Sequence, residues 1–264
     1  MGQERTLAFD IATAEEIRCV TDPVIRLESV SVRFRIPAEP IRSFKEYMIR
    51  RIRRQLGFWE VWALRDVSLE VQRGEVLGII GRNGSGKSTL LKVIARVLRP
   101  TSGRVWVKGR VAPLLELGGG FHPELTGREN IFLNGTLLGH TRQEIAERLD
   151  WIVDFAELWD FIDAPLRTYS TGMVARLGFA VATAWEPEIL LIDEVLAVGD
   201  TAFQRKCIAR LQEFRQRGTT VLLVSHNSQQ IRQLCDYAIW LDSGSVQAFG
   251  SPETVTAFYE KVMQ

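Results

Sequence analysis

The glycine-rich segment Gly81–Ser88 is the part of this sequence whose residue types and spacing point most directly to chemistry. It reads Gly-Arg-Asn-Gly-Ser-Gly-Lys-Ser and fits the pattern Gly-x-x-x-x-Gly-Lys-Ser/Thr in full. Glycines let backbone N–H groups surround phosphate oxygens without hindrance from a Cβ, and a following helix adds its positive end. The apolar stretch Val76–Ile80 precedes the loop, and Thr89–Val97 has a helical pattern. We therefore predict a phosphate-binding loop between a strand and a helix.

The residues of this loop have separate predicted roles. The Lys87 ammonium would reach the β- and γ-phosphates of a nucleotide, and the Ser88 hydroxyl would be a ligand of Mg²⁺. Contacts with the nucleotide are expected from Gly81, Asn83, Gly84, Ser85, Gly86, Lys87, Ser88 and Thr89.

Two acidic residues end a second apolar stretch, Ile189–Ile192. Asp193 would hold the Mg²⁺ ion, and Glu194 is placed to polarise a water molecule that attacks the γ-phosphate in line. An apolar run that ends in two acids is often an ordinary strand end. It indicates a catalytic site here because a complete phosphate loop precedes it in the same chain.

The segment Tyr169–Met173, which reads Tyr-Ser-Thr-Gly-Met, resembles the signature loop of ABC ATPases. That loop is usually Leu-Ser-Gly-Gly-Gln, and the resemblance implies that Ser170 and Gly172 contact a phosphate. His226, just past a second buried strand, matches the switch histidine of the same family, which senses the γ-phosphate. Asp200 stands where the dimer-contact loop of the family follows the catalytic glutamate, and the resemblance implies that it also contacts the nucleotide.

The resemblance extends from Val24 to about Leu241 and indicates the nucleotide-binding subunit of an ABC transporter. It implies that ATP and Mg²⁺ are the cofactors, and that Phe34 takes the place of the aromatic residue that stacks on adenine. In this family two copies pair head to tail, so Ser170 and Gly172 would act on the nucleotide of the partner copy. The resemblance also implies an integral-membrane permease as partner and a peripheral location on the cytoplasmic face of the cell membrane.

Two further features narrow the branch of the family. Residues 42–58 contain six basic residues and a single acid, with apolar residues every fourth position, which predicts a basic amphipathic helix. Glu116 stands near the position of the usual glutamine-loop residue, and we expect it to be a metal ligand. Both features resemble those of the ATP-binding subunits of bacterial exporters of O-antigen, capsule and wall teichoic acid. The resemblance therefore implies a polysaccharide on a polyprenyl pyrophosphate carrier as cargo, reached indirectly through the permease.

The basic segment has two interpretations. Cations beside an apolar stripe favour an anionic membrane surface or a lipid phosphate, at about 1 kcal/mol per basic residue. Alternatively, the segment packs on the sheet of its own domain and presents a solvated charged face. The sequence leaves the two open.

The elements that would position these residues alternate between strands and helices. Continuous apolar strands separated by helices predict an α/β fold of the phosphate-loop type, with a mostly parallel core sheet and an antiparallel β edge. A helical pattern over residues 126–184 predicts an inserted helical subdomain. We expect residues 1–23 to be an N-terminal extension and residues 24–264 to be the ATPase cassette.

Composition excludes several other classes. The 264 residues contain 33 basic and 32 acidic side chains, so overall charge does not favour nucleic acid. The chain lacks the roughly 18–20 consecutive apolar residues that cross a bilayer, and acids interrupt its first 17 residues, unlike a secretory signal. Three cysteines far apart fit neither a disulfide framework nor a zinc site. We expect any carbohydrate-recognition domain to lie in another chain.

Three alternatives stay open on the residues alone. The first is an ABC subunit for another cargo, such as drugs, lipids or ions. The second is a cytosolic ABC ATPase without a membrane partner. A small-molecule kinase built on a phosphate loop is the third, but it explains neither the signature loop nor His226.

Overall fold

The computed structural model describes residues 22–37, 58–115, 118–193 and 199–263. The predicted basic helix over residues 42–58 lies outside these ranges except for Phe58, which is the first residue of a strand. The predicted N-terminal extension lies outside them except for Asp22 and Pro23.

The core of the protein is a six-stranded sheet in the order β5-β6-β7-β3-β8-β9. All neighbouring strands pair in parallel except β8 and β9, which are antiparallel. The strands are β3 (Val76–Ile80), β5 (Val111–Leu114), β6 (Ile189–Asp193), β7 (Thr220–Val224), β8 (Tyr237–Asp242) and β9 (Ser245–Gly250). The predicted mostly parallel sheet is confirmed.

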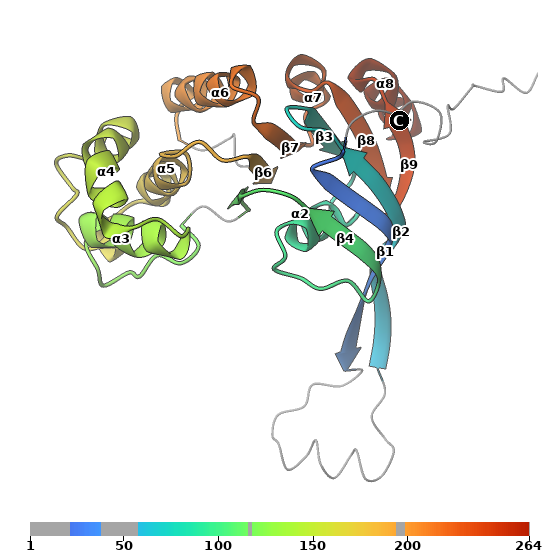
Figure 1. Ribbon diagram of the computed structural model, residues 1–264, viewed down its shortest axis with the longest axis horizontal. Coiled ribbons are helices and arrows are strands. Elements are labelled where there is room, and N and C mark those ends of the chain that lie inside the picture. The colour runs from blue at the N-terminus through green and yellow to red at the C-terminus, as the bar shows by residue number, and fades with distance from the viewer. Residues whose placement is uncertain (1–21, 38–57, 116–117, 194–198, 264) are drawn as a thin grey trace, which may run out of the picture.

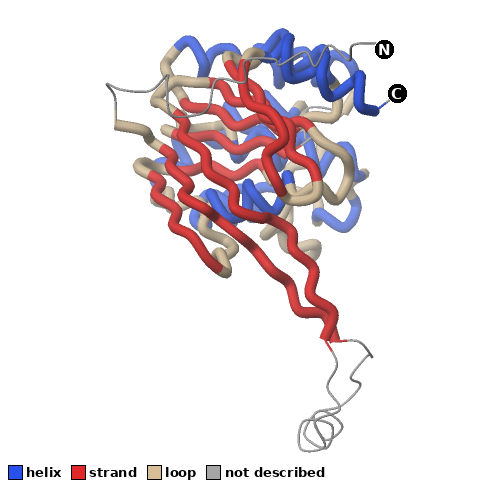
Figure 2. The backbone as a smooth tube through the Cα atoms, turned by 90° about the vertical axis from the view of Figure 1, so that its right-hand side faces the viewer, coloured by secondary structure: helices blue, strands red, loops and turns tan. Residues whose placement is uncertain are grey.

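A second sheet of three antiparallel strands packs against this core, in the order β2-β1-β4. Its strands are β1 (Ile25–Pro37), β2 (Phe58–Val71) and β4 (Ser102–Val107). The far ends of β1 and β2 extend beyond the rest of the molecule as a two-stranded arm (Figure 2). The predicted antiparallel strands are thus a separate layer of the cassette.

Helices cover both faces of the core sheet (Figure 1). Helix α2 (Lys87–Ile94) lies between the two sheets, where Leu90, Leu91 and Ile94 are buried in one hydrophobic core. Helices α6 (Thr201–Gln216), α7 (Ser228–Leu234) and α8 (Pro252–Met263) enclose a second core on the other face. Alternate residues of β3, β6 and β7 enter the two cores, as expected for strands buried on both sides.

Three helices form a separate group beside the sheet (Figure 1): α3 (Gly127–Leu137), α4 (Arg142–Ala156) and α5 (Thr171–Ala182). They share a hydrophobic core of their own, together with a short 3₁₀ turn at Leu166–Thr168. Capping boxes begin α3 and α4, in which a threonine and a glutamate three residues later satisfy each other's backbone N–H groups. This group coincides with the helical pattern of residues 126–184.

Some elements differ from the sequence expectations. Strands β5 and β9 and helix α8 lie where no element was predicted. Strand β5 has four residues, includes Pro113 and lies at the edge of the sheet, so its sequence carries little strand pattern. Helix α2 begins at Lys87, two residues before the predicted start. Within the described residues, no helix is both long and apolar enough to cross a membrane.

Candidate nucleotide-binding site

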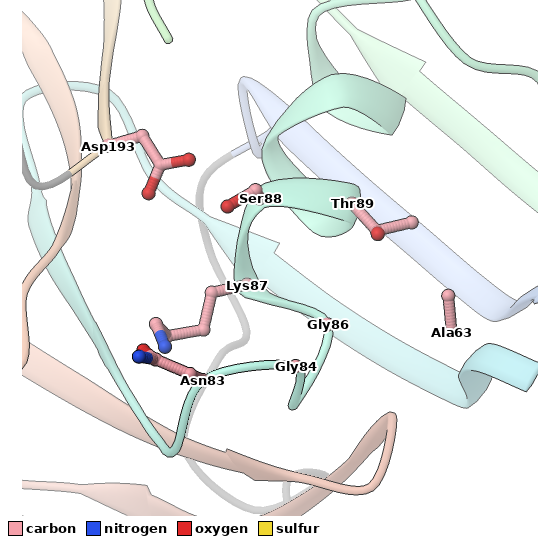
Figure 3. Close-up of a pocket in the computed structure, with 8 residues that line it drawn as sticks. All are labelled: Ala63, Asn83, Gly84, Gly86, Lys87, Ser88, Thr89 and Asp193. Carbon is pink, nitrogen blue, oxygen red and sulfur yellow. The ribbon is translucent and has the colours of Figure 1, made fainter.

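The phosphate loop and the end of strand β6 enclose a pocket of about 410 Å³ (Figure 3). Its wall combines loop backbone, a lysine, two hydroxyl groups and a carboxylate, from Ala63, Asn83, Gly84, Gly86, Lys87, Ser88, Thr89 and Asp193. Six of the eight phosphate-loop residues predicted to contact nucleotide line this pocket, together with the predicted metal ligand Asp193.

Two glycines hold the loop close to neighbouring backbone. A Cβ on Gly81 would lie 2.2 Å from the carbonyl oxygen of Leu241, and a Cβ on Gly86 would lie 2.4 Å from that of Ala63. Gly86 also has a φ of 107°, which residues with a Cβ rarely adopt. By contrast, no atom of the described part of the chain lies within 4 Å of a Cβ placed on Gly84. Neighbouring backbone therefore fixes the loop at Gly81 and Gly86, whereas the loop is open at Gly84, which lines the pocket.

The start of helix α2 supplies hydrogen-bond donors to this opening. Its N-cap residue, Gly86, has no side chain to cap the helix, so the N–H groups of its first residues depend on another acceptor. The Lys87 side chain is buried and its Nζ donates to the carbonyl oxygens of Gly81 and Arg82, at 2.8 and 2.9 Å. An ammonium has three donors, so it can bind one further acceptor. This arrangement suits phosphate oxygens.

Sheet order explains why Ser88 and Asp193 meet in the same pocket. Strand β7 lies between β3 and β6, and Val224 of β7 pairs with Ile79 on one side and Asp193 on the other. The carboxyl ends of these parallel strands therefore share one edge of the sheet. Among the described residues no cluster of three or more His, Cys, Asp and Glu could hold a metal by itself. A hydroxyl and a carboxylate beside bound phosphates fit Mg²⁺, which usually takes few protein ligands.

Other predicted residues lie near the pocket without lining it. The Ser85 side chain is buried beside Gly81, and its hydroxyl has no hydrogen-bond partner among the described residues. His226 is exposed and follows β7, the strand between the phosphate-loop strand and the strand of Asp193. Phe34 is 41% exposed on β1 and pairs with Val61, two residues before Ala63 of the pocket.

The signature segment belongs to the helical group and does not contribute to the phosphate-loop pocket (Figure 1). Ser170 is the N-cap of α5, and its Oγ accepts from the N–H of Met173 at 3.2 Å. Tyr169 is buried next to it and donates from its hydroxyl to the carbonyl oxygen of Phe161 at 2.6 Å; burial raises its pKa. Within the described ranges, a Cβ on Gly172 would meet only the Ser170 Oγ, at 3.8 Å.

Asp200 also lies away from the pocket, at the start of α6. Its carboxylate caps that helix by accepting from the N–H groups of Ala202 and Phe203. It also accepts from Arg176 of α5 at 2.6 Å. The hydrogen bond from Phe203 and the charge of Arg176 lower its pKa.

Glu194 and Glu116, the predicted general base and the predicted additional metal ligand, lie outside the described residues. Sequence reasoning missed two residues that the structure brings to this region. Ala63 lines the pocket beside a β-bulge between β1 and β2, for which the sequence has no signal. Arg176 could have been found as the basic residue that follows the signature segment on the same helix.

A parallel sheet, a phosphate loop that opens a helix and an acidic residue at the end of a nearby strand define a phosphate-loop nucleotide-binding cassette. The family described as ABC transporter matches residues 64–197. The chain belongs to this family and is an ABC-type ATPase. Its fold is similar to that of a dimeric ATP-binding cassette in a post-hydrolysis state bound to ADP and Pi, with a TM-score of 0.69 and 23% identity over 86% of this chain and 98% of that one.

Other relatives have a higher sequence identity to this chain, and their names refer to export. The O-antigen export system ATP-binding protein RfbB of Klebsiella pneumoniae is 54% identical over 76% of this chain and 82% of its own length. The teichoic acids export ATP-binding protein TagH of Lactococcus lactis is 45% identical over 78% of this chain. The chain spans only 44% of that TagH protein.

Proposed function

We propose that this chain is the ATP-binding and ATP-hydrolysing subunit of a bacterial exporter that moves a polyprenyl-pyrophosphate-linked polysaccharide or wall teichoic acid across the cytoplasmic membrane. The observation that carries the proposal is the pocket formed by the phosphate loop, Ser88 and Asp193, in a chain that is 54% identical to an O-antigen export ATP-binding protein. The cargo class follows from the names of the relatives and from the sequence features of the exporter branch.

In this proposal each group at the pocket has one task. Backbone N–H groups of the loop and the Lys87 ammonium bind the β- and γ-phosphates of ATP. Ser88 and Asp193, joined by Glu116, hold Mg²⁺, which would supply positive charge to the phosphates when bound. Glu194 accepts a proton from the attacking water and His226 contacts the γ-phosphate, while Phe34 stacks on the adenine ring.

The second half of each site would come from another copy of the chain. Gly172 supports this proposal, because its backbone is ordinary and a Cβ there would meet only one atom, at 3.8 Å. A glycine near the start of a helix reduces stability relative to alanine, and no contact among the residues that the structure describes requires a glycine here. A phosphate of a partner copy that approaches Ser170 and Gly172 would require it. Asp200 would reach the same interface from the start of α6.

The permease and the membrane complete the proposed assembly. The cassette would bind an integral-membrane permease at the cytoplasmic face of the membrane and act on the lipid-linked polymer only through it. Co-purification of the chain with a multi-spanning membrane protein would separate this function from that of a cytosolic ABC ATPase. A chain that is active in cells without any such partner would contradict the export function.

Replacing the proposed base tests the ATPase mechanism. Glu194→Gln keeps the size of the side chain but removes the proton acceptor, so we expect ATP binding with turnover reduced at least about 100-fold, the lower end of general-base effects. The variant should also accumulate as a dimer in ATP, seen as a doubled mass by light scattering. Lys87→Ala is the matched contrast, because it should weaken ATP binding itself. Normal ATPase activity of the Glu194 variant would show that another group is the base.

The basic segment requires a separate test in cells. Replacing Arg50, Arg51, Arg53 and Arg54 with glutamine should lower polymer export while ATP hydrolysis by the isolated subunit stays normal. The physical reason is the loss of about 1 kcal/mol of attraction to an anionic surface per arginine. Glutamine at Arg142 and Arg148, two basic residues of α4, is the control for a general loss of charge. Unchanged export by the fourfold variant would exclude a role at the membrane.

A further inference from the structure

Four charged side chains connect the signature helix α5 with the start of α6. Arg176 of α5 donates to Asp200 at 2.6 Å and to Glu157 at 3.1 Å. Glu157, at the end of α4, also accepts from Lys206 of α6. These side chains are called the α5–α6 clamp below. It joins three elements that are distant in sequence.

Arg176 is the centre of the clamp and the least exposed of its side chains. Its side chain is 19% exposed, against 60% for Asp200 and 48% for Glu157. The guanidinium carbon lies 5.1 Å from the centre of the Phe203 ring, a cation–π contact with α6. A planar guanidinium that binds two carboxylates and one ring has a defined orientation, which a lysine cannot reproduce.

The backbone conformation of Glu157 is unfavourable for a glutamate, which indicates that the clamp depends on the Glu157 carboxylate. Glu157 is the C-cap of α4 and has φ 58° and ψ 48°, a left-handed conformation that glycine or asparagine usually occupies. A glycine would adopt this conformation without strain but could not bind Arg176 and Lys206. The position therefore combines an unfavourable backbone with a carboxylate that bridges two cations.

The clamp connects two segments that the proposed function assigns to the nucleotide of a partner copy. Ser170 begins the helix that carries Arg176, and Asp200 is the N-cap of α6. We propose that Arg176 is a positioning residue that fixes the signature loop and the Asp200 loop relative to each other, so that both meet the nucleotide of a second copy together. This inference rests on the proposed function, because it requires ATP hydrolysis between two copies.

The test compares Arg176 with a second arginine that joins the same two helices at their other end. Arg210 of α6 donates to the carbonyl oxygen of Thr183, the C-cap of α5, at 2.8 Å. Its side chain is 13% exposed and lies over the rings of Trp151 and Phe214, at 4.8 and 4.5 Å. Arg210→Gln therefore removes a comparably buried arginine from the α5–α6 contact but leaves the clamp in place.

We expect Arg176→Gln to lower the ATP turnover rate of the full chain at least tenfold, while the Kd of the single chain for ATP changes less than twofold. Arg176→Lys should recover part of the rate. Arg210→Gln should lower thermal stability at least as much as Arg176→Gln, with turnover within twofold of the unmodified chain. Wild-type turnover by Arg176→Gln, or an equal loss of turnover in Arg210→Gln, would overturn the inference.

A double-mutant cycle keeps the test decisive if Arg176→Gln folds poorly. Asp200→Asn retains an oxygen that caps α6 but lacks the charge that binds Arg176. If the two residues act through their contact, Arg176→Lys combined with Asp200→Asn should lose no more turnover than the more severe single variant. Losses that multiply would show that the two residues act independently. Failure of the unmodified chain to bind or hydrolyse ATP would contradict the proposed function itself.

Discussion

The phosphate loop and the signature segment are both glycine-containing turns that begin a helix, but the protein holds them in opposite ways. The phosphate loop follows a strand whose five residues are all buried, and two of its glycines lie against neighbouring carbonyl oxygens. The signature segment begins an exposed turn, and Ser170 and Thr171 face solvent. Core packing fixes the first, whereas a helix cap and the α5–α6 clamp fix the second.

This difference indicates which half of the nucleotide site forms within a single chain. Packing of Gly81 and Gly86 against neighbouring backbone holds the phosphate loop in shape within a single chain. The signature segment has room around it, since a Cβ on Gly172 would have no neighbour closer than 3.8 Å among the described residues and the clamp consists of partly exposed ion pairs. Such contacts are individually weak and can adjust when another molecule approaches. Alanine at the phosphate-loop glycines should therefore lower the free energy of unfolding, whereas alanine at Gly172 of the signature segment should raise it.

The largest effect is expected at Gly86. Gly86→Ala places a Cβ 2.4 Å from the carbonyl oxygen of Ala63 at a φ of 107°. Strain of this kind costs about 1–3 kcal/mol before the clash is counted, so we expect the free energy of unfolding to fall by at least about 2 kcal/mol. Nucleotide binding should weaken at least about tenfold, because the N–H donors of α2 would shift. Urea unfolding without nucleotide and a titration with ATP measure the two quantities.

Gly84 provides the control in the same loop. Its φ is 79°, but among the residues described by the structure no atom lies within 4 Å of its Cβ position. Gly84→Ala should therefore lose only the conformational term, about 1 kcal/mol. Equal destabilisation by both variants would mean that close packing at Gly86 does not hold the loop.

At Gly172 the effect on stability should have the opposite sign. Gly172→Ala introduces a Cβ with one ordinary contact, at 3.8 Å, into the first turn of α5. Alanine restricts the unfolded chain and favours the helix, so we expect the free energy of unfolding to rise by about 0.5 kcal/mol. ATP turnover should nevertheless fall, because the proposed approach of a partner's phosphate would be blocked. Urea unfolding and a steady-state ATPase assay test the two effects on the same preparation.

Another helical glycine of the same group, Gly135, is the matched contrast. A Cβ on Gly135 would lie 2.8 Å from Ile145 of α4, so Gly135→Ala should lower stability. If Gly172→Ala also lowers stability, Gly172 has a structural role within the chain. If it is stable and fully active, the signature segment does not meet a nucleotide closely.

Much of the core could be predicted from the sequence because its signals are local. The strands β3, β6 and β7 are continuous apolar runs, and the phosphate loop is a contiguous motif whose backbone geometry follows from its own glycines. The meeting of Ser88 and Asp193 was also predictable, since parallel strands bring their carboxyl ends to one edge of the sheet. In these cases the residues that determine the structure lie next to those that perform the chemistry.

The remaining features depend on contacts between distant segments. Arg176 binds a carboxylate 19 residues before it and another 24 residues after it, and no periodicity in the sequence pairs them. Asp200 was predicted to contact nucleotide, yet within the chain its carboxylate caps α6 and binds Arg176; its role toward a partner stays a prediction. The short edge strand β5 carries too few residues to show a pattern. Tertiary packing, rather than local preference, decides each of these.

The smallest expected effect concerns the ion pair between Glu157 and Lys206 in the α5–α6 clamp. Hydrogen bonding and charge from Lys206, with a further contribution from Arg176, lower the pKa of Glu157 below its usual 4.5, although the nearby Asp200 opposes this. A carboxyl whose pKa is lower in the folded state stabilises the protein above its unfolded pKa and loses that contribution as the pH falls through the folded value. Lys206→Gln should therefore lower the free energy of unfolding at pH 7 by only a few tenths of a kcal/mol, about the value of an exposed ion pair.

The difference between Lys206→Gln and the unmodified chain should shrink as the pH falls through the lowered pKa of Glu157 in the folded protein, and should disappear once Glu157 is protonated in both proteins. It should also shrink at pH 7 in 1 M salt, where the Debye length is about 3 Å. Urea unfolding at each pH measures it, and the same series on Gly86→Ala is the control, because a steric clash does not depend on protonation. A Lys206 effect that persists at low pH would mean that the aliphatic part of the side chain, rather than its charge, supports the clamp.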